Sequence, residues 1–397
     1  MSGISVLSFG FTRGLWDGDS AEDVRRMRGY AEHLDAYIVI ANSYKRHGLR
    51  RRHLAKNFVA IPTNAFHAAD SFFRMLFLGW RELRLRRFDL IQGQDPFFSG
   101  LAAMLLGLCF GVPVVICVYG PNVHDPSWLA SRPSHGVLAI IGRWVLRHAS
   151  CLQVDGQMTA RSLIAAGYAP ERVEVKPMVP ANLDRFLAID RNAAVPRSPV
   201  RLLFVGRLAA QKNLPLMLTV ARALLESGGD AFRLRLVGEG RMEKALRKIV
   251  EREGLASHVE FRGSVSRDEI VGEFARADVF LLTSDYEGYP RVLMEAAASA
   301  LPVVTTAVSG SDESVRDGES GFIVPVGARD EIVAKLRLLI EDATLRARMG
   351  TAARALARTK LDPASNTRQQ LAIWRRITMP EAAPADSLAF VAAEKSR

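Results

Sequence analysis

The sequence predicts an α/β fold made of two doubly wound domains, each a parallel sheet covered by helices on both faces. Apolar runs of strand length alternate with helical patterns along most of the chain, and such alternation is typical of parallel sheets. The chain has 397 residues, 49% of them hydrophobic, which is enough for two cores of ordinary size. A polar stretch rich in Pro and Ala lies near the middle, and we expect it to join the two domains.

The predicted strands fall into two groups. In the first half of the chain they are 4–9, 36–41, 57–61, 88–93, 112–120, 150–156 and 172–178. In the second half they are 200–206, 232–238, 258–263, 277–284, 301–306 and 321–325. Each group should form one Rossmann-like sheet. The carboxyl ends of the strands should face a common central cleft, because ligands bind at those ends in such folds.

The domain boundaries follow from the same patterns. We expect a first domain over residues 1–185, a linker over 186–199 and a second domain over 200–360. A further helix is predicted over 361–379, where it can pack back on the first domain. Residues 380–397 have the composition of a disordered tail.

Charge and cysteine content narrow the range of partners. The formal net charge is +11, and most of the surplus of Lys and Arg lies between residues 24 and 88. Such a patch favours an anionic partner, which can be a membrane surface, nucleic acid or a phosphorylated substrate. The three cysteines lie in apolar surroundings without a motif spacing, which argues against disulfides and metal sites. The first residues read as a strand rather than a signal peptide, so we expect a cytoplasmic protein.

One uncharged stretch, 96–123, is long enough to resemble a membrane span. Gly111 and Pro113 interrupt it, and the residues after them are β-branched. We therefore expect a helix, a tight turn and a buried parallel strand.

The stretch LLFVGRLAAQKN places two cations after a strand. The strand ends at Gly206, Arg207 follows it, and Lys212 lies near the start of the next helix. Two cations beside a helix N-terminus suit a diphosphate. An ordinary βα turn with solvated charges has the same pattern, so this stretch alone leaves both interpretations open.

The stretch SDYEGYPRVLME holds two glutamates in different settings. Pro290 suits the first position of a helix, which places Glu287 in the preceding loop and Glu295 in an apolar part of the helix. Gly288 allows a ligand to approach the backbone. The N–H groups of the first turn form an expected anion site, namely those of Tyr289, Arg291 and Val292. A carboxylate in an apolar helix needs a partner, which can be an Arg, backbone amides or a pair of sugar hydroxyls.

Taken in order, GRLAAQKN, VGEG with Gly238, SDYEGYPRVLMEAAASALPVVTT and DGESGFIVP resemble the donor half of the retaining glycosyltransferases of the GT4 group. This group, also called glycosyltransferase group 1, has the GT-B fold. The resemblance implies that Arg207 and Lys212 hold the diphosphate of a nucleotide sugar. It also implies that Glu295 binds the ribose and that Glu287 contacts the transferred sugar.

The resemblance further implies that the amides after Gly288 bind phosphate and that Val265 borders the base. A nucleoside diphosphate leaves readily once its charge is stabilised, and two cations with a helix N-terminus can stabilise it without metal. We therefore expect no metal and no cofactor. For a retaining reaction we expect front-face attack, in which the leaving phosphate oxygen accepts the acceptor's proton.

The N-terminal half departs from the family pattern. Where relatives often have His-Gly at the end of a strand, this chain has Tyr119-Gly120. Tyrosine can hydrogen-bond to a hydroxyl but cannot become cationic. We expect Tyr119 or His124 to line the sugar site, although His124 can equally be an ordinary polar residue of the loop.

A basic and aromatic segment completes the candidate site. Arg50, Arg51 and Arg52 lie in a run without acids, and Phe73 and Trp80 lie among arginines on a predicted helix. This mixture suits a helix that lies against anionic lipid headgroups. The alternative is a core helix whose arginines reach solvent. The resemblance implies bacterial enzymes that assemble saccharides on polyprenyl diphosphate carriers, which are anionic and held in the membrane.

The sequence therefore predicts a retaining, metal-independent hexosyltransferase, peripheral on the inner face of the plasma membrane. It would move a sugar from a nucleotide-diphosphate donor to a lipid-linked saccharide in surface or exopolysaccharide biosynthesis. The alternatives are a nucleotide-sugar epimerase of the same fold, a basic nucleic-acid-binding protein and an inactive partner subunit. The chain has no recognisable nucleic-acid module, which argues against the second. The full set of cations and glutamates in the donor motifs argues against the third.

Overall fold

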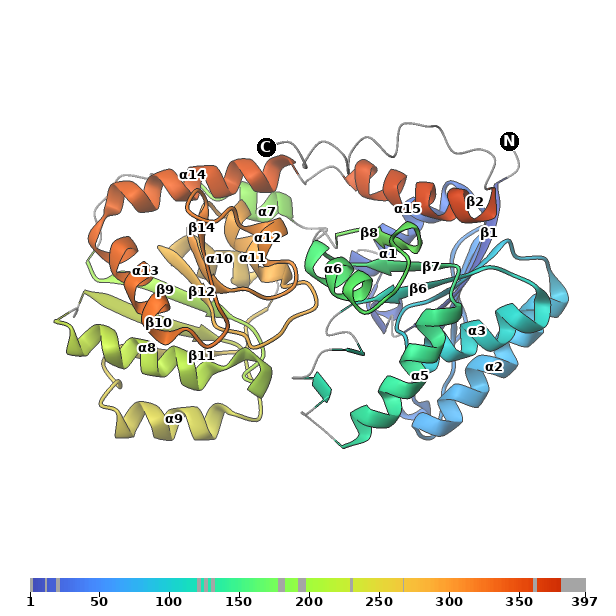
Figure 1. Cartoon of the computed structure of the whole chain (residues 1–397), viewed down its shortest axis with the longest axis horizontal. Helices are drawn as coiled ribbons and strands as arrows, with labels where there is room; N and C mark the ends of the chain where they lie inside the picture. Colours follow the sequence, from blue (N-terminus) through green and yellow to red (C-terminus); the bar gives the residue numbers. More distant parts are fainter. Residues whose placement is uncertain are drawn as a thin grey trace.

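The computed structural model describes residues 3–10, 13–18, 22–119, 123–124, 128–129, 133–177, 183–191, 198–228, 231–266, 268–359 and 363–379. The chain forms two α/β domains that lie side by side (Figure 1). The expected tail, 380–397, and residues 192–197 of the expected linker fall outside the described residues.

The N-terminal domain is built on an eight-stranded sheet in the order β3-β4-β2-β1-β5-β6-β7-β8. Its strands are β1 (Ile4–Gly10), β2 (Leu34–Ala41), β3 (Arg52–Ala55), β4 (Phe58–Pro62), β5 (Leu90–Gly93), β6 (Val114–Val118), β7 (Cys151–Val154) and β8 (Val173–Val175). All neighbouring strands are parallel except β3, which runs antiparallel to β4 at the edge. The strands are mostly buried on both faces, as expected for a parallel sheet between helices.

Helices cover both faces of this sheet. They are α1 (Glu22–Ala31), α2 (Ala68–Leu85), α3 (Phe98–Phe110), α5 (Ser134–His148), α6 (Gln157–Ala165) and α15 (Pro363–Thr378), with short 3-10 turns η1 (Arg13–Trp16), η2 (Lys45–His47) and η3 (Pro170–Arg172). Helices α2, α3, α5 and α6 share one apolar core with the sheet. Helices α1 and α15 share the core of the other face, where Trp374 is fully buried.

The C-terminal domain has a six-stranded parallel sheet in the order β11-β10-β9-β12-β13-β14. Its strands are β9 (Val200–Val205), β10 (Phe232–Val237), β11 (Val259–Gly263), β12 (Val279–Leu282), β13 (Val303–Thr306) and β14 (Gly321–Val324). Its helices are α7 (Leu183–Leu187), η4 (Ala210–Lys212), α8 (Leu214–Glu226), α9 (Glu243–Arg252), α10 (Glu269–Arg276), α11 (Arg291–Ala298), α12 (Ser311–Ser314), α13 (Arg329–Glu341) and α14 (Ala343–Thr359). The strand order reverses between β9 and β12, which makes that position the switch point of the sheet.

The chain passes between the domains earlier than the sequence indicates. Leu183, Phe186 and Ile189 already pack in the core of the C-terminal domain. Since Val175 closes the sheet of the N-terminal domain, the passage precedes the expected linker at 186–199. Helix α7 packs its apolar side chains against α10 and α11. This helix therefore belongs to the C-terminal domain, although its residues lie where the sequence indicates the end of the first domain and the start of the linker. The chain returns after α14, and α15 packs on the N-terminal domain.

Every strand predicted from the sequence has a counterpart, and β3 is the one strand of the described chain without a prediction. Its residues, RHLA, alternate between exposed and buried in a short edge strand, which leaves too little apolar pattern to recognise. The uncharged stretch forms α3, a left-handed turn at Gly111 (φ 68°) and the buried strand β6, as expected. No helix in the described ranges has both the length and the apolarity to span a bilayer.

Candidate donor and acceptor site

The carboxyl edges of both sheets face each other. Gln157 starts α6 just after β7, and its backbone N–H donates to the carboxylate of Glu313, in α12 after β13. Beside it the hydroxyls of Thr159 and Ser309 lie 2.7 Å apart. The loops that follow the strands of both domains therefore meet at one cleft, as the two-domain prediction requires.

A pocket of about 630 Å³ opens at the switch point of the C-terminal sheet. The loops after β9 and β12 line it together with the start of α11. Its lining residues are Arg185, Phe186, Val205, Gly206, Arg207, Gln211, Lys212, Ile270, Glu287, Tyr289, Pro290, Arg291, Val292 and Glu295. A larger cavity, of about 820 Å³, lies toward the amino ends of β9, β10 and β11. Because ligands of doubly wound sheets bind at the carboxyl ends of the strands, at the switch point, the smaller pocket is the better ligand site.

The loop after β9 holds the two expected cations. Arg207 is exposed, and Lys212 ends the turn η4 with its side chain buried. Asn213 then caps α8, since its side chain accepts from the N–H of Leu216 at 3.3 Å, and it takes a left-handed conformation with φ 44°. Asn213 also donates to Asp285 at 2.6 Å, which joins this loop to the loop after β12.

The loop after β12 places Glu287 against Lys212. The ammonium group of Lys212 donates to Oε1 of Glu287, and the hydroxyl of Ser284 donates to the same oxygen at 2.5 Å. Both charged side chains are about nine-tenths buried. Burying a charge is costly unless it is paired, and this pairing meets that requirement for both groups. Of the two cations in the loop after β9, Arg207 is therefore the one whose charge is more available to an anion.

The start of α11 differs in detail from the prediction. Pro290 precedes the helix instead of beginning it, because its ψ of 84° is not helical. The N–H of Arg291 donates to the carbonyl of Tyr289 at 2.9 Å, so this amide is not free as the sequence suggested. Val292 and Tyr289 do line the pocket. Glu295 lies just over one turn into α11, half-buried, and also lines the pocket.

Three glycines allow these loops to approach closely. A Cβ atom on Gly238 would lie 2.0 Å from the carbonyl oxygen of Gly206, and Gly238 takes φ 133°. The N–H of Gly206 donates to the carbonyl of Val237 at 3.0 Å, which keeps the ends of β9 and β10 together. Gly288 is half-buried between Glu287 and Tyr289. Val265 packs against the core of the domain and is not among the residues that line the pocket.

Several pocket residues had no signal in the sequence. Arg185 and Phe186 come from α7, the first helix of the C-terminal domain, and Arg185 pairs with Asp268 at 2.8 Å. Gln211, which lines the pocket, and Ser284, which donates to Glu287, lie within the two motifs, but Gln and Ser are common in loops. Only the sheet order shows that these separate segments converge.

On the N-terminal side, Tyr119 and His124 are engaged within their own domain. The hydroxyl of Tyr119 accepts from Nε2 of Gln153 at 3.0 Å. The residue as a whole is 39% exposed, whereas burial of its hydroxyl, with Cys117 nearby, raises the pKa of Tyr119 well above its usual value. A ring nitrogen of His124 lies 3.2 Å from the hydroxyl of Tyr168. Burial, with Arg143 and Arg147 nearby, lowers the pKa of His124, which favours the neutral imidazole.

The basic segment is partly structural. Arg51 lies 3.7 Å from the buried carboxylate of Glu82, and Arg52 donates to the carbonyl of Leu15 at 2.7 Å. Arg50 is exposed, and its carbonyl accepts from the indole N–H of Trp16. Phe73 and Trp80, by contrast, point to solvent.

Among the described residues, no group of three His, Cys, Asp or Glu side chains is placed to hold a metal ion. The Asp-x-Asp sequence at 17–19 belongs to the N-terminal domain, and Asp17 is not among the residues of the donor pocket.

Comparison with known families agrees with this architecture. The model of the glycosyl transferase 4-like domain matches residues 3–178, and the model of the glycosyl transferases group 1 matches residues 188–356. The chain belongs to this family, the GT4-type glycosyltransferases with the GT-B fold.

Individual relatives agree with the assignment. The putative colanic acid biosynthesis glycosyltransferase WcaL of Escherichia coli is 39% identical over 272 residues, 62% of this chain and 65% of that protein. WcaL of Salmonella typhimurium is 36% identical over 183 residues, 45% of this chain and 44% of that protein. Less than two thirds of either relative is therefore matched. Anabaena HepE in complex with UDP-glucose has the same fold, with a TM-score of 0.68 and 19% identity over 93% of this chain and 98% of that one.

Proposed function

We propose that this chain is a retaining, metal-independent glycosyltransferase that moves a sugar from a nucleoside diphosphate to a lipid-linked saccharide in exopolysaccharide biosynthesis. One observation carries the proposal: the pocket at the switch point brings Arg207 and Lys212 together with Glu287 and Glu295 from two segments that lie far apart in the sequence. The WcaL relatives are named for colanic acid biosynthesis, and HepE binds UDP-glucose. UDP-glucose is therefore the first donor to test.

Each pocket residue has a role in this reaction. Arg207, with Lys212, stabilises the charge that develops on the departing diphosphate. Glu295 accepts from the ribose hydroxyls, and Glu287 contacts the transferred sugar. When the acceptor oxygen bonds to the anomeric carbon, the bond to the phosphate oxygen breaks on the same face, and that oxygen takes the acceptor's proton.

The remaining candidate roles belong to the same proposal. Tyr119 or His124 would line the sugar site from the N-terminal domain, and Gly206, Gly238, Gly288, Tyr289 and Val292 would bring backbone close to the donor. Val265 would border the base. Arg50, Arg51, Arg52, Phe73 and Trp80 would contact the acceptor or an anionic membrane surface, which makes the enzyme peripheral on the inner face of the plasma membrane.

A donor screen tests this function. UDP-, GDP- and ADP-sugars are added to the full chain, and the thermal shift and the hydrolysis of each donor are measured. We expect one nucleotide class to raise the melting temperature, and NMR of the product to show that the anomeric configuration of the donor is kept. Inversion of that configuration would reject retention. Conversion of free donor into an epimer would support the epimerase instead, and no shift with any nucleotide would reject the donor site.

A further inference from the structure

A third cavity of the C-terminal domain is rich in arginine. It has a volume of about 340 Å³ and lies between α14, the ends of α10 and α11, and the segment that follows α7. This cavity, here called the arginine cavity, contains the four arginines Arg191, Arg346, Arg354 and Arg358 and the two acids Asp190 and Asp278. Four arginines against two acids leave a surplus of two positive charges.

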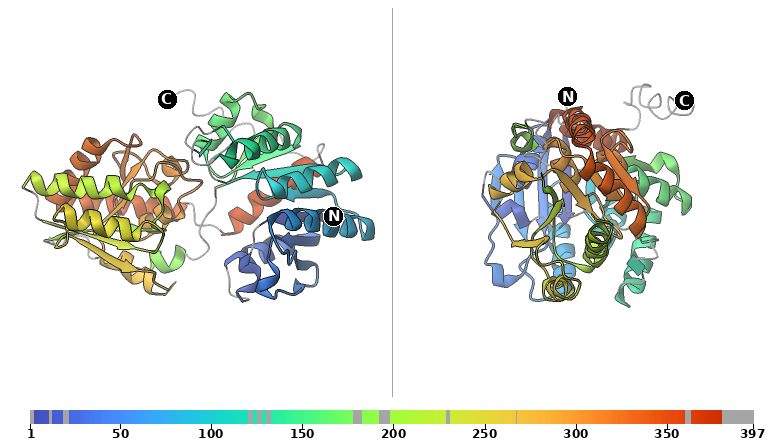
Figure 2. Two further views of the ribbon diagram at one scale, coloured as in Figure 1. Left: turned by 90° about the horizontal axis from the view of Figure 1, so that it is seen from below. Right: turned by 90° about the vertical axis from the view of Figure 1, so that its left-hand side faces the viewer.

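The arginine cavity lies at the opposite edge of the sheet from the donor pocket. Asp278 directly precedes β12 and Pro302 directly precedes β13, so the cavity is at the amino ends of these strands. Helix α14 lies on the opposite side of the domain from α9 (Figures 1 and 2). The first residues of α11 line the donor pocket, whereas Ala300, just past its end, lines the arginine cavity. The two sites are therefore separate.

One face of α14 supplies both charge and space. Arg346, Arg354 and Arg358 recur at spacings of eight and four, which places them on one side of the helix. Ala347 and Ala355 lie beside them, and their small side chains leave room for a ligand. The opposite face of the helix is buried in the core of the domain.

Hydrogen bonds to the ends of helices hold two of the arginines in place. Arg191 donates to carbonyls at the ends of α10 and α11, among them that of Ala277 at 2.7 Å. Arg354 donates to the carbonyl of Ala298, the last residue of α11, at 3.2 Å and to that of Ile189 at 2.6 Å. Carbonyls at a helix C-terminus carry a partial negative charge, which suits a guanidinium. These two arginines are therefore fixed before any ligand arrives.

The arginines of the cavity keep donors that no described residue uses. Nη1 of Arg354 and both Nε and Nη2 of Arg346 make no hydrogen bond within the described ranges. Arg358 is exposed and has neither a hydrogen bond nor an ion pair in the described part of the chain. Burial, with the charge of Arg358 nearby, lowers the pKa of Arg354. An anion among these groups would relieve their repulsion.

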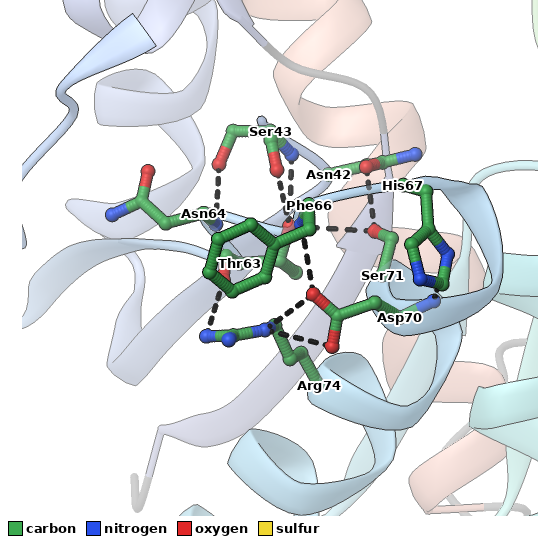
Figure 3. Close-up of polar contacts among 9 residues, drawn as sticks. All are labelled: Asn42, Ser43, Thr63, Asn64, Phe66, His67, Asp70, Ser71 and Arg74. Carbon is green, nitrogen blue, oxygen red and sulfur yellow. Dashed lines mark hydrogen bonds and ion pairs between the residues drawn. The ribbon is translucent and has the colours of Figure 1, made fainter. Parts of the chain in front are cut away.

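Two other groups of arginines in the described chain have carboxylate partners. Arg74 donates to Asp70 at 2.9 Å, within the polar network at the start of α2 (Figure 3). Arg235, in the cavity of about 820 Å³, pairs with Glu260 and Glu273, both at 2.8 Å. The four arginines of the arginine cavity have no carboxylate within ion-pair distance among the residues that the structure describes.

The two acids of the cavity do not neutralise it. Asp278 is paired with Arg201, which lies outside the cavity, at 3.1 Å, and it also accepts from the backbone N–H of Arg201 at 2.9 Å. Asp190 is exposed and forms no ion pair within the described ranges. Charges of one sign that line a concave site favour a ligand of the opposite sign.

We propose that the arginine cavity binds a phosphate-class oxyanion, either free or carried on a larger metabolite. The planar fork of a guanidinium fits two oxygens of a phosphate, and about 340 Å³ is enough for a small ligand. A single carboxylate would leave part of the surplus charge uncompensated. Since the chain enters the domain through α7 and leaves it after α14, the bound anion would join the two passages. This site goes beyond the proposed function and does not depend on it.

Calorimetric titration of the full chain with inorganic diphosphate tests the site. We expect diphosphate to bind and to raise the melting temperature. Arg358→Gln should weaken binding at this site about tenfold, because a charge-assisted contact is lost. The variant should fold, since Arg358 is exposed and has no partner among the described residues. Arg348→Gln, which removes the same charge from an exposed position of α14 outside the cavity, is the matched control and should bind like the wild type.

Chemical modification locates the anion. Phenylglyoxal modifies accessible guanidinium groups, and mass spectrometry of the peptides reports which arginines have reacted. Bound diphosphate should protect Arg358 and leave Arg348 unprotected. Equal modification of Arg358 with and without diphosphate would overturn the proposal.

The choice of probe distinguishes the sources of the phosphate. Inorganic phosphate, inorganic diphosphate and UDP are compared in the same protection assay. Protection of Arg358 by the inorganic ions alone assigns the site to a free ion, and protection by UDP as well assigns it to phosphate carried on a nucleotide. Citrate carries several carboxylates, and tighter binding of citrate than of diphosphate would reject the phosphate class.

The donor pocket is tested in parallel with Arg207→Ala. If Arg358→Gln loses diphosphate binding that Arg207→Ala retains, the arginine cavity is an anion site whether or not the chain uses a nucleotide sugar. If Arg207→Ala loses all binding and Arg358→Gln binds like the wild type, this inference fails and the donor proposal stands. No binding of diphosphate to the wild type would also reject the arginine cavity.

Discussion

The carboxylate of Glu313, in the C-terminal domain, accepts a hydrogen bond from the backbone N–H of Gln157, the first residue of α6 in the N-terminal domain. A carboxylate at a helix N-terminus satisfies an otherwise unpaired amide. Here the helix and the carboxylate belong to different domains, so the contact links the two domains. Burial raises the pKa of Glu313 from 4.5 to about 7, and the neighbouring Asp312 adds to the effect.

This pKa makes stability depend on pH. Below pH 4.5 both the folded and the unfolded chain hold the proton, so the folded state has no disadvantage. Between about pH 4.5 and 7 the unfolded chain releases its proton while the folded chain still holds it, so stability falls over this range and levels off above about pH 7, where the folded chain has ionised as well. Glu313→Gln keeps the acceptor oxygen without the charge. We expect the melting temperature of this variant, relative to that of the wild type, to increase as the pH rises through this range. Calorimetry at a series of pH values measures the difference.

The control is Glu319→Gln, which changes an exposed carboxylate on the same segment. Its melting temperature should follow the wild type at every pH. Parallel curves for wild type and Glu313→Gln would show that Glu313 does not titrate in this range.

The buried pair of Lys212 and Glu287 gives a second prediction, on stability. Lys212→Met leaves the Glu287 carboxylate buried without its partner, and we expect unfolding in urea to show a loss of about 3 kcal/mol. Adding Glu287→Gln should restore part of this loss, because the unpaired charge is gone. The exposed pair of Arg337 and Glu341 serves as the control: Arg337→Met should cost under about 1 kcal/mol. If Lys212→Met and Arg337→Met lost equal amounts of stability, the Glu287 carboxylate would have to be solvated rather than buried.

A third prediction concerns nucleotide affinity. If Glu295 accepts from the ribose hydroxyls, Glu295→Ala removes hydrogen bonds to a charged group and should weaken UDP binding about 10- to 100-fold. Calorimetric titration with UDP measures this, and the melting temperature checks that the variant folds. Glu331→Ala, at the exposed start of α13, is the matched control. An unchanged affinity for UDP in Glu295→Ala would remove Glu295 from the ribose site.

The sequence predicted those features that a local residue pattern determines, and it missed those that depend on contacts between distant segments. Apolar runs predicted the parallel strands, since each run carries its own pattern. The edge strand β3 was missed because four alternating residues carry too little pattern. Lys212 and Glu287 were expected to meet in one pocket, but their direct pairing depends on the sheet order that brings β9 beside β12. The contact between Glu313 and Gln157 crosses the domains and has no local signature at all.

The last prediction concerns catalysis. Since Lys212 is neutralised by Glu287, Arg207 is left as the exposed cation at the end of β9. We expect Arg207→Ala to lower kcat about 10²- to 10³-fold with a smaller change in KM, because charge builds up on the diphosphate mainly in the transition state. Arg207→Lys should recover part of the rate, since it keeps the charge but loses the planar fork. Rates are measured with the donor identified by the screen. An equal fall in affinity for the ground-state donor would make Arg207 a binding residue only, and wild-type rates would place it outside the phosphate site.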